Sequence, residues 1–124
     1  MNKPTMTLKE VMGMERFAVV GDTLNPEKYA CKIKEAMLRA GYTVYAVGKE
    51  LESLNDIPDE IDIIDLCINP AKGLKLMQEC KKNFRGIVIQ PGAGSAELKA
   101  YLDEHNMTYI DDCLLLGLAD FPRR

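Results

Sequence analysis

Five short apolar segments alternate with segments of helical periodicity along this chain, and this alternation limits its fold more than any other feature. The apolar segments are RFAVVG (16–21), YTVYAV (42–47), DIIDLCI (62–68), GIVIQ (86–90) and TYI (108–110). Short apolar runs of this kind are typical of buried parallel strands. Strands that alternate with helices predict a parallel sheet with right-handed crossover connections.

The helical segments between these strands are marked by residues that favour helix ends. The expected starts are Asn25–Pro26, Asn69–Pro70 and Ser95, and the expected ends are Gly41 and Asn106. Asparagine and serine cap the first free N–H groups of a helix, proline suits its first turn, and glycine or asparagine suits the residue after its end. The segment between the second and third strands has no clear long helix.

The resulting order of elements, β-α-β-β-α-β-α-β, predicts an α/β fold. We expect a Rossmann-like, doubly wound, parallel five-stranded sheet in a three-layer αβα arrangement. The expected strand order is 3-2-1-4-5, with the ligand crevice at the switch point between strands 1 and 4. Residues 1–15 are expected to be an N-terminal extension with a short helix, because Thr7 and Glu10 have capping-box spacing. Residues 16–124 are expected to form the domain.

Composition excludes several classes of protein. A length of 124 residues fits one domain, and the net charge of −3 gives no basic surplus for nonspecific nucleic-acid binding. No apolar run is long enough to cross a bilayer and the N-terminus lacks a signal-peptide pattern, so we expect a cytoplasmic protein.

The methionines of the extension are candidates to cover a dimer surface. The four cysteines form no C-x-x-C pair, which disfavours a metal cluster, and we expect free thiols, with Cys67 in the core.

Ligands of a doubly wound sheet bind beyond the carboxyl ends of its strands. Four segments qualify here, namely residues 21–28, 47–49, 69–71 and 90–94. In the first, Gly21 allows a tight turn toward a helix N-terminus, where an anion such as phosphate is favoured and where Thr23 and Lys28 add a hydroxyl and a charge. The alternative is that Gly21 is a turn residue and Asn25 a cap. Asn69–Pro70 and the sequence QPGAG likewise predict either a ligand wall or a simple helix start and turn.

Catalytic side chains are few. The single histidine, His105, is expected at a helix end far from the switch point. Asp62 and Asp65 are expected to be polar residues at a strand edge, and Cys113 to be either a buried thiol or a reactive one near the site. The dinucleotide fingerprint G-x-G-x-x-G and the P-loop motif are both absent, which disfavours NAD and nucleoside triphosphates.

The segment FAVVGDTLNPEKYACKIKEAMLRAGYTVYAV resembles the start of the small CoA-binding-domain proteins, which are similar to the CoA-binding domain of the succinyl-CoA synthetase α subunit. The segments SLNDIPDEIDIIDLCINP, GIVIQPGA and DDC continue the resemblance in the same order, over about residues 16–116. The more specific parts are N-P-x-K after the first glycine and Q-P-G after the fourth strand.

The resemblance implies a Rossmann-like fold that binds coenzyme A or an acyl-CoA without catalysis of its own. The synthetase also carries a phosphohistidine domain, which has no counterpart in this sequence, so ligase activity is not expected. The contacts implied by the resemblance come from Gly21, Thr23, Asn25, Lys28, Val47, Asn69, Pro70, Gln90, Pro91 and Gly92. Asp22, Gly48 and Lys49 stand at the same strand ends and complete the candidate binding residues.

Three features keep other functions open. Asp22 stands where family members usually have a small residue, Gly48–Lys49 replaces the usual Asn-Pro, and the connection after the second strand is short. A degenerate domain that has lost CoA and serves as an interaction or regulatory module would explain them. A protein that binds an NAD-type nucleotide is the remaining alternative.

Overall fold

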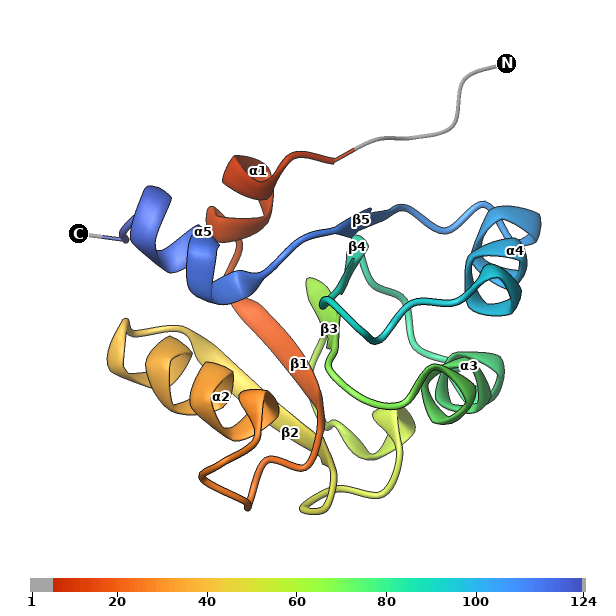
Figure 1. Ribbon diagram of the computed structural model, residues 1–124, viewed down its shortest axis with the longest axis horizontal. Helices are drawn as coiled ribbons and strands as arrows, with labels where there is room; N and C mark the ends of the chain where they lie inside the picture. Colours follow the sequence, from red (N-terminus) through yellow and green to blue (C-terminus); the bar gives the residue numbers. More distant parts are fainter. Residues whose placement is uncertain (1–5, 124) are drawn as a thin grey trace.

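A five-stranded parallel sheet forms the centre of the computed structural model, which describes residues 6–123 (Figure 1). Residues 1–5 of the expected extension and Arg124 lie outside the described residues. The strands are β1 (Arg16–Gly21), β2 (Thr43–Gly48), β3 (Ile63–Leu66), β4 (Gly86–Ile89) and β5 (Tyr109–Asp111). All four pairings are parallel, as the alternation of strands and helices predicts.

Helices cover both faces of this sheet (Figure 1). They are α1 (Leu8–Met12), α2 (Tyr29–Arg39), α3 (Pro70–Glu79), α4 (Ala96–Glu104) and α5 (Leu114–Asp120), with a 3-10 turn, η1 (Leu54–Asp56). The core layer under α1, α2 and α5 includes Phe17, Val19, Ile63 and Val88 of the sheet. The opposite layer, under α3, α4 and η1, takes the alternate strand residues. The three-layer αβα class is therefore confirmed.

The position of β3 within the sheet differs from the expectation. The strand order is β2-β1-β3-β4-β5 and not 3-2-1-4-5, because β3 pairs with β1 instead of β2. Every residue of β3 is buried, which requires a neighbour on each side, whereas β2 is half-buried over its first three residues and suits an edge. The switch point consequently lies between β1 and β3.

Helix ends were predicted correctly at four places and wrongly at one. Asn106 follows the end of α4 with φ of +56°, as expected. Asn69 caps α3, with Pro70 as its first residue, and Ser95 caps α4. After α2 the chain turns at Gly41, where φ is +93°. However, α2 begins at Tyr29 and not at Pro26, because residues 25–28 form a separate turn in which the Lys28 N–H bonds the Asn25 carbonyl at 2.9 Å.

The two outermost helices pack on each other. The Thr7–Glu10 capping box of α1 is present as expected, whereas the segment expected to be partly irregular after β5 contains α5. Gly117 of α5 lies so close to α1 that a Cβ atom there would come within 2.5 Å of the Met12 sulfur. The Met12 carbonyl accepts a 2.6 Å hydrogen bond from the Tyr42 hydroxyl, which ties α1 to the start of β2.

No described helix is both long and apolar enough to cross a membrane.

Candidate functional site

The carboxyl end of β1 approaches its two neighbouring strands very closely. Gly21 has φ of +150°, and a Cβ atom there would stand 2.2 Å from the Cys67 carbonyl oxygen. Gly48, its partner on β2, has φ of +124°, and its Cβ would stand 2.7 Å from the Gly21 carbonyl oxygen. Both glycines are therefore required by the packing of the strand ends against each other.

A cavity of about 350 Å³ opens at the ends of β1, β3 and β4, which is where a doubly wound fold binds ligands. We call it the switch-point cavity. Its lining consists of Asp22, Lys28, Tyr29, Ala30, Cys67, Ile68, Asn69, Pro91, Gly92 and Ala93. Five of the candidate binding residues thus meet in one place, namely Asp22, Lys28, Asn69, Pro91 and Gly92.

The N-terminus of α2 gives one side of this cavity a positive character. Lys28 is exposed, stands at the N-cap position and makes no side-chain capping bond. The first turn of α2 holds no acidic residue, so neither a cap nor a carboxylate offsets the helix dipole there. Asp22, which is half-buried, adds one negative charge to the same lining.

The side chains of the other candidates in the loop after β1 form hydrogen bonds with nearby residues. Thr23 is buried and its hydroxyl donates to the Glu50 carboxylate at 2.9 Å. Glu50 also accepts from Lys34 at 2.6 Å, and this bond lowers the pKa of Glu50. The Asn25 side chain accepts the Glu27 N–H at 3.0 Å. Neither Thr23 nor Asn25 lines the switch-point cavity.

The candidates at the end of β2 also lie outside that lining. Val47 is fully buried in the core layer beneath α3 and α4. The Gly48 N–H bonds the Leu51 carbonyl at 2.6 Å, which closes a tight turn around the exposed Lys49. Pro70 lines a different cavity, between the start of α3 and the start of α4.

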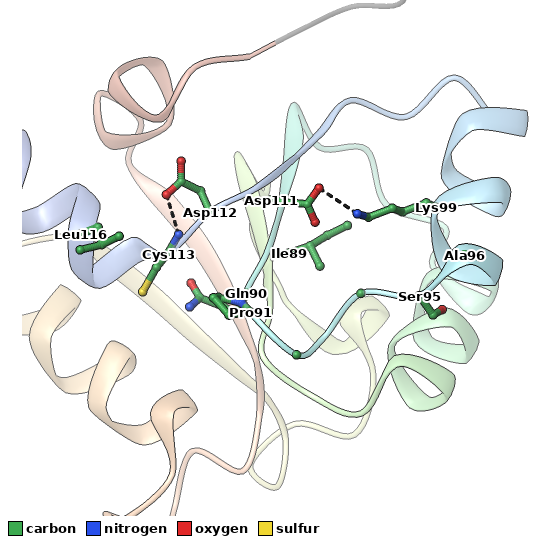
Figure 2. A pocket seen from close by; sticks show the side chains of 12 residues that line it. Ile89, Gln90, Pro91, Ser95, Ala96, Lys99, Asp111, Asp112, Cys113 and Leu116 are labelled. Carbon is green, nitrogen blue, oxygen red and sulfur yellow. Dashed lines mark hydrogen bonds and ion pairs between the residues drawn. The ribbon is translucent and has the colours of Figure 1, made fainter.

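A second cavity, of about 750 Å³, adjoins the first beyond Pro91 and Gly92, which belong to both linings. We call it the β4–β5 cavity, and Figure 2 shows its side chains. The remaining lining is Ile89, Gln90, Gly94, Ser95, Ala96, Lys99, Asp111, Asp112, Cys113 and Leu116. Lys99 and Asp111 form an ion pair of 2.9 Å across it, and this bond raises the pKa of Lys99.

Gln90, a further candidate, holds two parts of the fold together. Its main-chain N–H bonds the Leu66 carbonyl of β3 at 3.0 Å. Its buried side-chain carbonyl accepts the Leu114 N–H at the start of α5, at 2.9 Å. Gln90 therefore fixes the start of α5 above the end of β4, between the two cavities.

Asp65 is the residue for which the sequence interpretation was wrong. It was expected at a strand edge, yet it is completely buried in β3, and neither carboxylate oxygen has a hydrogen-bond partner within the described residues. Burial raises its pKa well above the ordinary value. The sequence feature that could have indicated this burial is an acidic residue inside the apolar run IIDLC, in a strand covered on both faces.

Cys67 lies two residues after Asp65, just beyond the end of β3, and is half-buried, not fully buried as expected. Burial, together with smaller contributions from the neighbouring Asp65 and Cys113, raises the pKa of its thiol to about 12. Cys67, Tyr29, Ala30 and Ile68 line the switch-point cavity without having been identified as site residues from the sequence, whereas Ala93 lies within the expected segment 90–94. All four cysteines are free thiols.

The remaining catalytic candidates, His105 and Asp62, lie outside both cavities and make structural contacts. His105 is exposed at the end of α4, where its ring lies 4.3 Å from that of Tyr101. Asp62 accepts the main-chain N–H groups of Glu15 and Arg16 at 3.1 and 2.9 Å. Among residues 6–123, no group of three or more His, Cys, Asp or Glu side chains is arranged to hold a metal ion.

Comparison with solved structures shows the same fold in several proteins. A hypothetical protein from Pyrococcus horikoshii superposes with a TM-score of 0.80 at 23% identity, over 92% of this chain and 89% of that one. A conserved hypothetical protein from Pyrococcus furiosus gives 0.74 at 25% identity, over 83% and 98%. An acetyl-coenzyme A synthetase from Candidatus Korarchaeum cryptofilum, solved with phosphate and ADP, gives 0.68 at 20% identity, over 85% of this chain and 27% of the synthetase.

No functionally curated protein sequence matches the chain. A family model described as a CoA binding domain, however, matches residues 15–119. This match runs from the residue before β1 into α5, and so includes every strand of the sheet and both cavities. The chain belongs to the CoA binding domain family.

Proposed function

We propose that this chain binds coenzyme A or an acyl-CoA in the switch-point cavity. The observation that carries the proposal is the meeting of Asp22, Lys28, Asn69, Pro91 and Gly92 on one cavity, in a chain whose family is that of a CoA binding domain. These residues follow three different strands, β1, β3 and β4, so only the folded sheet brings them together.

Charge and backbone geometry support a phosphate-bearing ligand. Lys28 and the uncapped N–H groups of α2 offer a cation and free donors on one wall. In the same lining, Gly92 has φ of +88° and no atom within 4 Å of where its Cβ would stand. A ligand therefore has open access to the backbone at Gly92, without a side chain in between.

Asp22 supports a second candidate function, an interaction domain that has lost CoA. Its carboxylate lines the same cavity as Lys28. A carboxylate about 4 Å from a phosphate costs on the order of 1–4 kcal/mol. If this repulsion outweighs the attraction to Lys28 and α2, the cavity does not hold a pyrophosphate.

Thermal unfolding with CoA, acetyl-CoA, NAD and AMP, each added separately at millimolar concentration, tests the proposal. A ligand at 100 times its dissociation constant adds about 2.7 kcal/mol to the free energy of unfolding. For a domain of this size, that free energy raises the midpoint by several degrees. We expect this shift with CoA and acetyl-CoA, and a smaller one with NAD and AMP.

Two variants identify the cavity, and a third is their control. Lys28→Ala is expected to reduce the CoA shift, whereas Lys81→Ala, which removes an exposed lysine after α3, is expected to leave it unchanged. Asp22→Asn is expected to increase it. If CoA shifts the unfolding midpoint of Asp22→Asn but not that of the wild type, the chain is an interaction domain that has lost CoA.

A further inference from the structure

Two free thiols lie on either side of Gln90, and the function proposed above makes no use of them. Cys67 follows Leu66, whose carbonyl accepts the Gln90 main-chain N–H at 3.0 Å. Cys113 precedes Leu114, whose N–H donates to the Gln90 side chain at 2.9 Å. In Figure 2 the Cys113 side chain lies next to that of Gln90. Gln90 therefore bonds the backbone next to each cysteine, and Cys113 lies near enough to Cys67 to raise the pKa of its thiol, although the two are 46 positions apart in the sequence.

Each thiol lines one of the two adjoining cavities. Cys67 belongs to the switch-point cavity and Cys113 to the β4–β5 cavity, and both are half-buried. The walls that the cavities share are Pro91 and Gly92. An extended ligand with its phosphates near Lys28 would have to cross Pro91 and Gly92 for its far end to reach Cys113.

The far end of CoA is itself a thiol. We propose that Cys113, with Cys67 beside it, is a thiol–disulfide exchange site that takes CoA disulfide and joins one CoA to the protein through a mixed disulfide. This inference rests on the proposed function, because binding of the nucleotide end is what delivers the sulfur. The substrate class is a disulfide that carries the CoA nucleotide.

The exchange balances without another reactant. The Cys113 thiolate attacks one sulfur of CoA disulfide and forms a new S–S bond, while the original S–S bond breaks. One CoA leaves as a thiolate and takes up the proton that Cys113 gave to solvent. Cys113 is oxidised by this step, and the departing CoA is reduced.

The two cysteines differ in their readiness to attack. The pKa of about 12 at Cys67 leaves it protonated at neutral pH, with a thiolate fraction of about 1 in 10⁵. Cys113 is consequently the attacking thiol, and Cys67 releases the bound CoA slowly. The Cys67 thiolate fraction rises about 300-fold from pH 7 to pH 9.5, because it increases tenfold per pH unit below the pKa. At pH 9.5 Cys67 then displaces CoA and leaves a Cys67–Cys113 disulfide.

Intact-mass and peptide-mass measurements on the full chain test the proposal. The reduced protein is treated at pH 7 with CoA disulfide or, separately, with glutathione disulfide. We expect one CoA per chain, located on Cys113, formed at least tenfold faster than the glutathione adduct and slowed by excess acetyl-CoA. Cys113→Ser is expected to abolish the adduct, and Cys80→Ser, whose thiol lies on the other side of the sheet, is the matched control. Lys28→Ala is expected to slow only the reaction with CoA disulfide.

The adducts are then moved to pH 9.5. The wild type is expected to lose its CoA, whereas Cys67→Ser keeps it. Equal rates with the two disulfides, an adduct on another cysteine, or retention of CoA by the wild type at pH 9.5 would each overturn the proposal. A thermal shift with reduced CoA but no adduct on Cys113 would leave the proposed CoA binding intact and refute the exchange site. Absence of both the shift and the adduct would refute both proposals.

Discussion

Replacement of Asp65 by leucine is expected to stabilise the protein and to change how its stability depends on pH. The Asp65 carboxyl is fully buried, and its neighbours across the sheet are Val19 and Val88. Neither of its oxygens has a partner among the described residues. A buried polar group without a hydrogen bond costs about 1–3 kcal/mol, which leucine, an apolar side chain, avoids. We therefore expect Asp65→Leu to raise the free energy of unfolding by about that amount near pH 4, where the carboxyl is protonated, and by more at pH 7.

The pH dependence has a definite sign. Burial raises the pKa of folded Asp65 above its value of about 3.9 in the unfolded chain, so the folded state binds the proton more tightly. The resulting stabilisation is complete below about pH 4 and is lost as the pH rises toward the folded pKa. Within that window the wild type loses about 1.4 kcal/mol per pH unit from this group. Asp65→Leu has no such loss.

Urea unfolding followed by circular dichroism at pH 5, 6, 7 and 8 measures both effects. The gap between Asp65→Leu and the wild type should widen as the pH rises from 5. Asp120→Asn, which removes an exposed carboxylate on α5, controls for the loss of one negative charge. Parallel stability curves for the wild type and Asp65→Leu, or a leucine variant less stable at pH 7, would refute the account of Asp65 as a buried, unpartnered acid.

Two further predictions follow from the ends of β1 and β3. Gly21→Ala places a Cβ 2.2 Å from the Cys67 carbonyl oxygen, and we expect it to lower the free energy of unfolding, measured with urea, by more than about 3 kcal/mol. Gly92→Ala has open space around its Cβ and should lower the free energy of unfolding by about 1 kcal/mol, from its positive φ alone. In a variant whose other three cysteines are changed to serine, Cys67 should react slowly with iodoacetamide because its pKa is about 12. At pH 8 we expect a rate on the order of a thousand times lower than that of a cysteine in an unstructured peptide. Equal rates would show that the thiol is not buried as described.

Local features of the fold were predictable because they depend on neighbouring residues. Asn69 bonds the N–H of Ala71 at 2.9 Å and Ser95 bonds the N–H of Leu98 at 3.1 Å, and both helix starts were identified from these residue types. The same reasoning misplaced the start of α2, because Asn25 forms an equivalent bond within a turn that precedes the helix. A capping side chain marks a turn of backbone, and the sequence does not show whether a helix continues from it.

Long-range features were less accessible. The pairing of β3 with β1 depends on which strand is buried on both sides, and the apolar runs for β2 and β3 are too similar to decide that. The candidate site shows the same limit. The sequence identified five residues of the switch-point cavity. Two other candidates do not reach it, because Thr23 donates its hydroxyl to Glu50 and Val47 packs in the hydrophobic core. Cys67 lines the cavity because β1 and β3 are neighbours, which the expected strand order excluded.

The contact between α1 and α5 also has a consequence for synthesis on the ribosome. Val11 and Met12 of α1 are buried, and Gly117 is the residue that lets α5 come close enough to cover Met12. Helix α1 is translated before α5 and thus lacks part of its cover until α5 has emerged. A nascent chain that stops at β5 carries an exposed apolar surface around α1, which is a binding site for chaperones and a source of aggregation. Emergence of α5 from the ribosome is therefore the step that completes this layer of the core.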